Sequence, residues 1–197
     1  MKGKRVFSAT ELRDIAVSLL VLSVVFSYPE LISNPPAVLV SLFVLGLAFI
    51  GHELSHKFVA RRRGFFAEYR MWVHGLLLAV VFAVATGGTL IFAAPGAVVF
   101  SSYFVFKRPH RDDVGRIALS GPAFNIILLF LFSIAYAVTN VGVLVFASAV
   151  NGWLAIFNLI PIDPLDGGKI FKWDKRIWAI TMAAAVFGFL VASGILI

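Results

Sequence analysis

The sequence contains no cysteine, which excludes disulfide bonds, thiolate metal ligands and a cysteine nucleophile. Charged residues are also scarce. Asp, Glu, Lys and Arg make up 14% of the 197 residues, whereas about 25% is usual in a soluble domain. No stretch is both polar enough and long enough to form a water-soluble domain. Because cysteine is absent, any metal site must use histidine and carboxylate ligands.

Hydrophobic residues dominate what remains: they form 60% of the chain, and the mean hydropathy is +0.96. Soluble domains have about 45–50% apolar residues, so we expect a multi-pass membrane protein. The formal net charge of +7 is first a topology signal and only second a sign of acidic partners or anionic lipid. Nucleic-acid binding is not expected, because the basic residues lie between the apolar segments and form no groove interleaved with aromatic residues.

The order of the apolar segments predicts the membrane spans. We expect a first span from about Leu12 to Tyr28, after a short basic start. A cleaved signal peptide is the competing interpretation, but no small-x-small site precedes Pro29. The other full spans are expected at residues 36–60, 117–138, 141–161 and 177–197.

The number of spans depends on Gly75–Ala94, which is long enough to cross the membrane but is interrupted at Thr86-Gly87-Gly88. A single crossing gives six spans and places the basic, hydrophilic segment 107–116 outside, against the positive-inside rule. A segment that enters and returns gives five full spans and keeps every basic cluster in the cytoplasm. We favour the re-entrant arrangement and retain six spans as the alternative.

Short strands are expected beside this segment. Residues 65–73 alternate in polarity, residues 98–106 are rich in β-branched and aromatic side chains, and Ala94–Ala97 is interpreted as a turn. The predicted fold class is therefore an all-α polytopic membrane protein, with five or six transmembrane helices and short interfacial or re-entrant β-strands. We expect one transmembrane domain over residues 1–197, with its core at about 36–172.

The sequence His52-Glu53-Leu54-Ser55-His56 ends the second predicted span. Residues four apart lie on one face of a helix, so His52 and His56 can bind one Zn²⁺, and Glu53 can reach a water molecule at the metal. Ionisable residues inside an apolar helix are costly unless they have a partner, so a functional site is favoured over a structural His pair.

A hydrolytic zinc site usually has a third protein ligand. His74 and His110 lie at or beyond span ends and are interpreted as solvated histidines. The stretch 158–168 is a better source, because its prolines and glycines interrupt the helix at the cytoplasmic side, where His52 and His56 are also expected. It carries two acidic candidates, Asp163 and Asp166, and a solvated turn at a span end is the alternative for both.

With these motifs the sequence resembles the site-2 protease family of intramembrane zinc metallopeptidases. His52-Glu53-x-x-His56 is similar to the first motif of that family. Asn158–Gly168, which reads Asn-x-x-Pro-x-x-Pro-Leu-Asp-Gly-Gly, is similar to its second, and Gly121–Asn125 is similar to the Gly-Pro-x-x-Asn element between them. Many members also carry a PDZ domain, and no stretch of this sequence is suited to form one or any other soluble domain.

The resemblance implies a role for each matching residue. His52, His56 and Asp166 are expected to bind one Zn²⁺ per chain, with Glu53 as the general base. Asn158 is expected to bind substrate or stabilise the oxyanion. Asn125 is a second candidate for that role, although a lone Asn in a span is as often a polar contact between helices.

The function that follows is hydrolysis of peptide bonds within or near transmembrane segments of membrane-protein substrates. The expected partners are such a substrate and the lipid bilayer, and the sequence carries no signal for an oligomeric state. We expect a multi-pass protein of a prokaryotic cell membrane with its active site toward the cytoplasm. The alternatives are a catalytically inactive membrane-embedded binding protein on the same scaffold and, less favoured, a metal-ion transporter.

Overall fold

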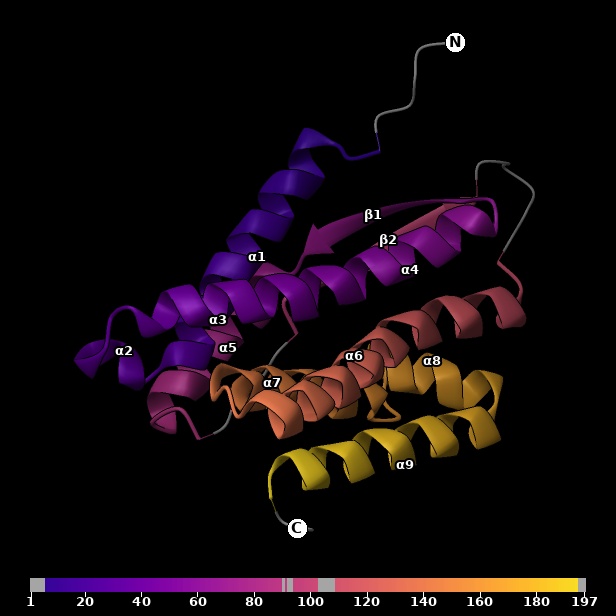
Figure 1. The fold of residues 1–197 in the computed structure, drawn as a ribbon. Helices are drawn as coiled ribbons and strands as arrows, with labels where there is room; N and C mark the ends of the chain where they lie inside the picture. The colour runs from indigo at the N-terminus through magenta and orange to yellow at the C-terminus, as the bar shows by residue number, and fades with distance from the viewer. Residues whose placement is uncertain (1–5, 90, 92–93, 103–108, 195–197) are drawn as a thin grey trace.

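The computed structural model describes residues 6–89, 91, 94–102 and 109–194, and its elements are shown in Figure 1. A π-helical turn at Gly46–Ile50 joins two of the helices into one continuous element. In chain order the helices and strands are α1 (Ala9–Ser27), α2 (Glu30–Ser33), α3 (Ala37–Leu45), α4 (Gly51–Arg62), β1 (Phe65–Met71), α5 (Val73–Ala85), β2 (Gly96–Ser102), α6 (Arg111–Thr139), α7 (Val143–Leu159), α8 (Asp166–Trp173) and α9 (Lys175–Ala192).

Three helices of the described chain are long and apolar enough to cross a membrane: Ala37–Arg62, Arg111–Thr139 and Lys175–Ala192. Each has 18 residues or more, near the roughly 20 that a bilayer core requires. They correspond to the spans predicted at 36–60, 117–138 and 177–197. The span predicted at 141–161 corresponds to α7, which is apolar and shorter, and the first predicted span corresponds to α1.

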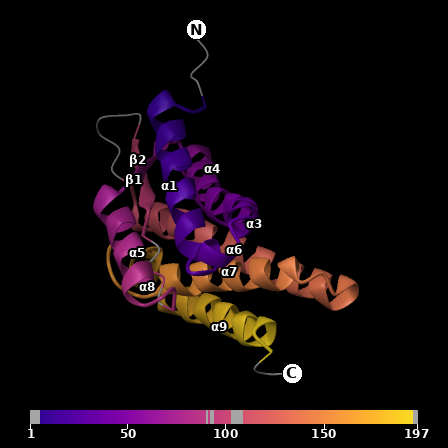
Figure 2. The same ribbon diagram turned by 90° about the vertical axis from the view of Figure 1, so that its left-hand side faces the viewer.

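The helices form successive layers in both views (Figures 1 and 2). The layer of α3 and α4 lies between α1 and the pair α6 and α7, and α9 covers the far side of that pair. Close packing depends on small residues: a Cβ atom at Gly51 of α4 would lie 2.1 Å from the Phe124 ring of α6. Such contacts are how membrane helices approach one another without a hydrophobic driving force.

The segment Gly75–Ala94 leaves and returns at the same end of a two-stranded antiparallel sheet. β1 and β2 pair from Phe65 opposite Ser102 to Met71 opposite Gly96. Beyond the last pair, the Trp72 N–H donates to the Pro95 carbonyl at 2.8 Å. Helix α5 ends in a turn in which Gly87 and Gly88 have φ values of +62° and +83°, a region that favours glycine. The segment therefore doubles back, as the re-entrant prediction requires.

Two boundary predictions in this region were wrong. Gly96 and Ala97 were assigned to a turn, but they belong to β2, because the hairpin register extends the sheet as far as Met71. The strand predicted at 98–106 therefore begins two residues earlier, and its residues 103–106 lie outside the described chain. The span predicted from residue 117 is part of a longer helix, because α6 begins at Arg111, with the His110 side chain as its N-cap.

The charged start of α1 packs against the sheet and α4. Lys57 of α4 forms a buried ion pair with Glu11, with Nζ–Oε distances of 2.7 and 2.5 Å. Glu11 also accepts a hydrogen bond from the Tyr69 N–H at 3.0 Å, and Asp14 accepts one from the Met71 N–H at 3.4 Å. The α1 carboxylates thus satisfy donors on the edge of β1 that faces away from β2.

Candidate metal centre

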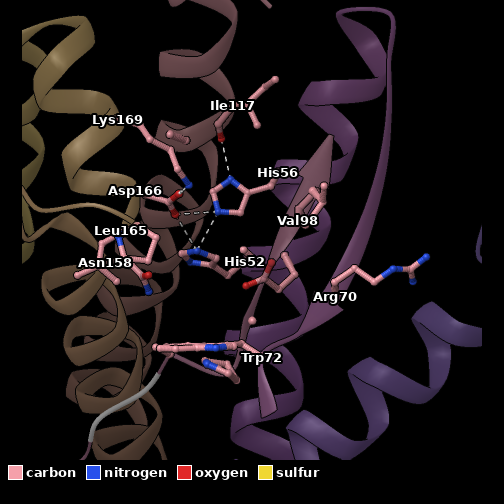
Figure 3. Close-up of a pocket in the computed structure, with 18 of the residues that line it drawn as sticks. His52, His56, Arg70, Trp72, Val98, Ile117, Asn158, Leu165, Asp166 and Lys169 are labelled. Carbon is pink, nitrogen blue, oxygen red and sulfur yellow. Dashed lines mark hydrogen bonds and ion pairs between the residues drawn. The ribbon is translucent and has the colours of Figure 1, made fainter. Parts of the chain in front are cut away.

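Helix α4 presents two imidazoles to one point (Figure 3). His52 and His56 are four residues apart, and both side chains are buried. Their rings meet edge to face, and their Nε2 atoms are 3.0 Å apart. The helical spacing therefore brings the two imidazole Nε2 atoms together, as the sequence predicts.

Asp166 completes the cluster from the opposite side. Its Oδ2 atom lies 3.3 Å from His52 Nε2 and 2.9 Å from His56 Nε2. It is the first residue of α8, after a non-helical connection from α7. That connection needs glycine at 167, where a Cβ atom would lie 2.1 Å from the Leu159 carbonyl oxygen. The competing candidate, Asp163, is exposed and pairs with Lys172 instead.

The other nitrogen of each imidazole is held by a hydrogen bond. His52 Nδ1–H donates to Asn125 Oδ1 at 2.5 Å, and His56 Nδ1–H donates to the Ile117 carbonyl at 2.7 Å. Bonds of this kind set the tautomer and ring orientation of metal-binding histidines. Both Nε2 atoms therefore direct lone pairs, and no proton, toward Asp166.

Three acceptors consequently converge without a donor between them, an arrangement that a cation stabilises. Two ligands on a tetrahedral zinc, each at about 2.0–2.1 Å, lie roughly 3.3 Å apart, close to the observed spacing of 2.9 to 3.3 Å. Space is reserved there by Gly121 of α6, where a Cβ atom would lie 2.4 and 2.5 Å from the two Nε2 atoms. The residues present thus fit a zinc ion.

Glu53 borders the same cavity. Its Oε2 atom is buried and has no hydrogen-bond partner among the described residues. A buried carboxylate oxygen without a donor is costly, and it suits a site where a water molecule is to be deprotonated. The cavity has a volume of about 280 Å³, and its walls come from α4, β2, α6, α7 and the start of α8.

Two named relatives are similar to this chain in sequence. The chain is 38% identical over 180 residues to a protein of Methanocaldococcus jannaschii named "Putative zinc metalloprotease MJ0611", covering 88% of this chain and 90% of the relative. The chain belongs to the site-2 protease family. A second member, "Putative zinc metalloprotease Rip3" of Mycobacterium tuberculosis, is 31% identical over 160 residues, or 73% of this chain. The match covers 34% of Rip3. No family model matches the chain, and no solved structure matches it.

The remaining residues of the site-2 protease motifs occupy different places. Asn158 lines the cavity, and its Nδ2 donates to the Leu154 carbonyl at 2.9 Å. Asn125 is 0% exposed and lies behind His52, where its only contact with the cluster is the Nδ1 bond. This position suits the orientation of a ligand rather than contact with a substrate.

The two remaining histidines lie away from the cluster, as predicted. His74 and His110 are both exposed, one in α5 and one at the cap of α6. Asp112 pairs with Arg63 and Arg116 near the ends of α4 and α6. Surface pairing accounts for that carboxylate.

Two contacts were not predicted from the sequence: that of Lys169 with Asp166 and that of Asn151 with Asn125, the residue that holds His52. Lys169 Nζ donates to Asp166 Oδ1 at 3.0 Å, so Oδ1 is occupied while Oδ2 faces the imidazoles. Its position three residues after Asp166 at a helix start was a usable signal. Asn151 contacts Asn125 across 26 positions of sequence, and its one local signal is that it is polar in an apolar helix.

Proposed function

We propose that this chain is an intramembrane zinc metalloendopeptidase that hydrolyses peptide bonds within or near transmembrane segments of other membrane proteins. One zinc ion per chain is held by His52, His56 and Asp166. The observation that carries the proposal is the convergence of three acceptor atoms beside the unpaired carboxylate oxygen of Glu53. The names of the two relatives support the same reaction class.

In this proposal zinc supplies Lewis-acid activation of a water molecule, whose pKa falls toward roughly 7. Glu53 would accept a proton from the attacking water as the water oxygen bonds to the scissile carbonyl carbon, and would then deliver that proton to the leaving amine. The buried Oε2 of Glu53 has no competing donor among the described residues, so it is available for this transfer.

Asn158 is proposed to stabilise the developing oxyanion. Its side chain lines the same cavity as Glu53, and the close-up shows it beside Leu165 and Asp166 (Figure 3). One N–H of its amide donates to the Leu154 carbonyl, and the second remains for a substrate oxygen. A preorganised donor of this kind lowers the barrier where charge develops.

The substrate is proposed to bind in an extended conformation along β2. A helix hides its carbonyls in hydrogen bonds, so a transmembrane substrate must unwind locally before attack. Residues 96–100 of β2 line the cavity, whereas the outer edge of β1 is engaged by Glu11 and Asp14. These contacts support β2 rather than β1 as the strand to which the substrate adds.

The chain is proposed to form one multi-pass domain with five full spans and a re-entrant hairpin formed by α5 and its return. The three long apolar helices, the shorter α7 and α1 supply those spans. Every basic cluster then faces the cytoplasm, and the metal centre lies toward that side. The origins of the relatives support a prokaryotic cell membrane.

The test is Glu53→Gln, assayed in proteoliposomes against a panel of single-span test proteins of varied sequence. We expect cleavage by wild type and a loss of about 10²- to 10⁴-fold in the variant, with zinc content unchanged. Glu30→Gln, at an exposed carboxylate between α1 and α3, is the matched control. Equal product from wild type and Glu53→Gln would remove the enzyme assignment and favour a binding protein on the same scaffold.

A further inference from the structure

A buried amide on α7, that of Asn151, contacts Asn125, which holds the His52 ring. Asn151 is 0% exposed and lies in a mostly apolar helix. Its Oδ1 accepts a hydrogen bond from Asn125 Nδ2 at 2.9 Å. Its own Nδ2 donates to the Ala147 carbonyl one turn back at 2.8 Å. Only its acceptor oxygen therefore reaches across to α6, and it reaches the residue that holds His52.

A 180° rotation of the Asn125 amide would exchange its Oδ1 and Nδ2 atoms, so its hydrogen-bond partners determine which of the two faces His52. Its Nδ2 donates to Asn151 Oδ1 and to the Ala48 carbonyl at 3.1 Å. Both N–H groups are then used, and Oδ1 is left facing His52 Nδ1. In the reversed orientation an N–H would face His52 Nδ1, and the ring proton would move to Nε2, the atom that faces Asp166 and His56.

We propose that Asn151 is a positioning residue of the metal centre. It fixes the orientation of the Asn125 amide and thereby holds His52 in the Nδ1–H tautomer, with Nε2 free to bind a metal. The inference rests on the proposed function only in that His52 is a metal ligand, and it does not require that the chain cleave anything.

A control for a merely structural role lies one turn away on the same pair of helices. Ser148 of α7 is also buried, and it contacts Ser133 of α6 at 2.7 Å and the Leu129 carbonyl at 3.0 Å. This pair joins α6 to α7 through polar contacts, as Asn151 and Asn125 do, but none of these contacts reaches His52. If Ser148→Ala also weakens zinc binding, the cause is helix packing. If only substitution of Asn151 weakens it, the cause is the position of the ligand His52.

The first experiment measures zinc affinity of the detergent-solubilised chain by chelator competition, with no substrate present. Asn151→Leu keeps the number of side-chain heavy atoms and the branching at Cγ, and it removes the acceptor. We expect its Kd for zinc to rise about 10-fold, within the usual range for second-shell partners, and that of Ser148→Ala to stay within about twofold. An unchanged Kd in Asn151→Leu would overturn the proposal.

A rescue variant separates orientation from packing. Asn125→Asp presents an accepting oxygen to His52 Nδ1 whichever way the carboxylate is turned. We therefore expect Asn151→Leu to weaken zinc binding in the wild-type background but to have little effect in the Asn125→Asp background. An equal loss in both backgrounds would show that Asn151 acts through packing, and would refute the proposal.

The tautomer is also measurable without metal. With ¹⁵N-labelled histidine, the ring nitrogen shifts of His52 should report Nδ1–H in the metal-free wild type and a mixture of tautomers in Asn151→Leu. The same tautomer in both would contradict the proposal. A chain that binds zinc and shows these shifts, but cleaves no test protein, would retain this inference while the proposed protease function fails.

Discussion

Two clusters of buried polar groups lie on different faces of α4, and the adjacent residues His56 and Lys57 belong one to each cluster. His56 joins His52 and Asp166 in the metal centre, whereas Lys57 faces Glu11 of α1. The Lys57 cluster is balanced: the ammonium, a backbone N–H of β1 and the carboxylate satisfy one another. The metal centre is unbalanced, because its three facing atoms are all acceptors.

This difference separates a structural cluster from a ligand site. A buried ion pair whose members are satisfied within the chain needs nothing further, and its loss is felt as instability. A set of converging acceptors is incomplete by itself and gains stability when a cation binds. Burial alone does not distinguish them, since Lys57 and His56 are 4% and 5% exposed.

The largest expected effect is that of Asp166→Ala, which removes one of the three acceptors. We expect zinc content to fall from about one per chain to near zero and proteolysis to disappear with it. Metal analysis of the purified variant checks the first expectation. Asp163→Ala is the matched control, because that carboxylate is exposed and pairs with Lys172, and it should retain its zinc. A zinc-free Asp163→Ala would reverse the assignment of the third ligand.

Gly121→Ala is expected to act at the same point without changing any ligand. Its Cβ atom would lie within 2.4 to 2.5 Å of both Nε2 atoms, so the imidazoles must separate. We expect zinc affinity to fall by 10-fold or more. Gly46→Ala is the control, because a Cβ atom there has no neighbour within 4 Å. Titration of both variants with zinc decides, and equal affinities would place the metal elsewhere.

Lys57→Met tests the balanced cluster. It leaves Glu11 buried without its cation, and we expect a loss of about 3–5 kcal/mol of unfolding free energy. The double variant Glu11→Gln/Lys57→Met leaves no lone charge and should lose less, since Gln still accepts from the Tyr69 N–H. Denaturation in mixed micelles measures both. If the double variant is as unstable as the single one, lost packing rather than the unpaired charge is responsible.

The smallest effect is expected for Ser133→Ala, which removes a neutral contact between α6 and α7. Hydrogen bonds between membrane helices contribute about 0.6 kcal/mol on average, and Ser148 retains the Leu129 carbonyl as a partner. We expect a change in unfolding free energy of that size and no change in zinc content. A loss as large as that of Lys57→Met would mean that neutral and charged contacts are equally important to this fold.

Tyr69 shows how closely the sheet is held against α1. Burial raises the pKa of its phenol well above the ordinary value, so the hydroxyl stays protonated at neutral pH and shares a hydrogen bond of 2.9 Å with Ser18. Together with the Tyr69 N–H bond to Glu11, this ties one residue of β1 to α1 through both its backbone and its side chain.

The sequence predicted the parts of the fold that depend on local pattern. The spacing of His52 and His56, the doubling back at Gly87-Gly88 and the helix interruption before Asp166 all follow from residues within one or two turns of each other. The partners of Lys57 and Asn125 lie 46 and 26 positions away. Hydropathy does not encode such pairings, because many helix arrangements bury the same apolar surface.

Two features of the helices were missed for a different reason. The start of α6 at Arg111 is hydrophilic, and an amphiphilic first turn that extends beyond the apolar core resembles a loop in a hydropathy profile. The π-helical turn at Gly46–Ile50 adds a residue to one turn without changing composition. Nothing in the pattern of apolar side chains distinguishes it from the α-helix on either side.

That π-helical turn also sets the phase of α4 relative to α3. One additional residue in a turn sets every later side chain back by about 100° around the helix axis compared with an uninterrupted α-helix. His52 and His56 follow the turn, so the direction in which they point is coupled to it, while the lipid-facing surface of α3 is not. An uninterrupted α-helix of the same sequence would have almost the same hydropathy and span length, but both imidazoles would be rotated away from Asp166. The π-helical turn thus allows the side chains of α3 and those of α4 to point in directions that are set independently of each other.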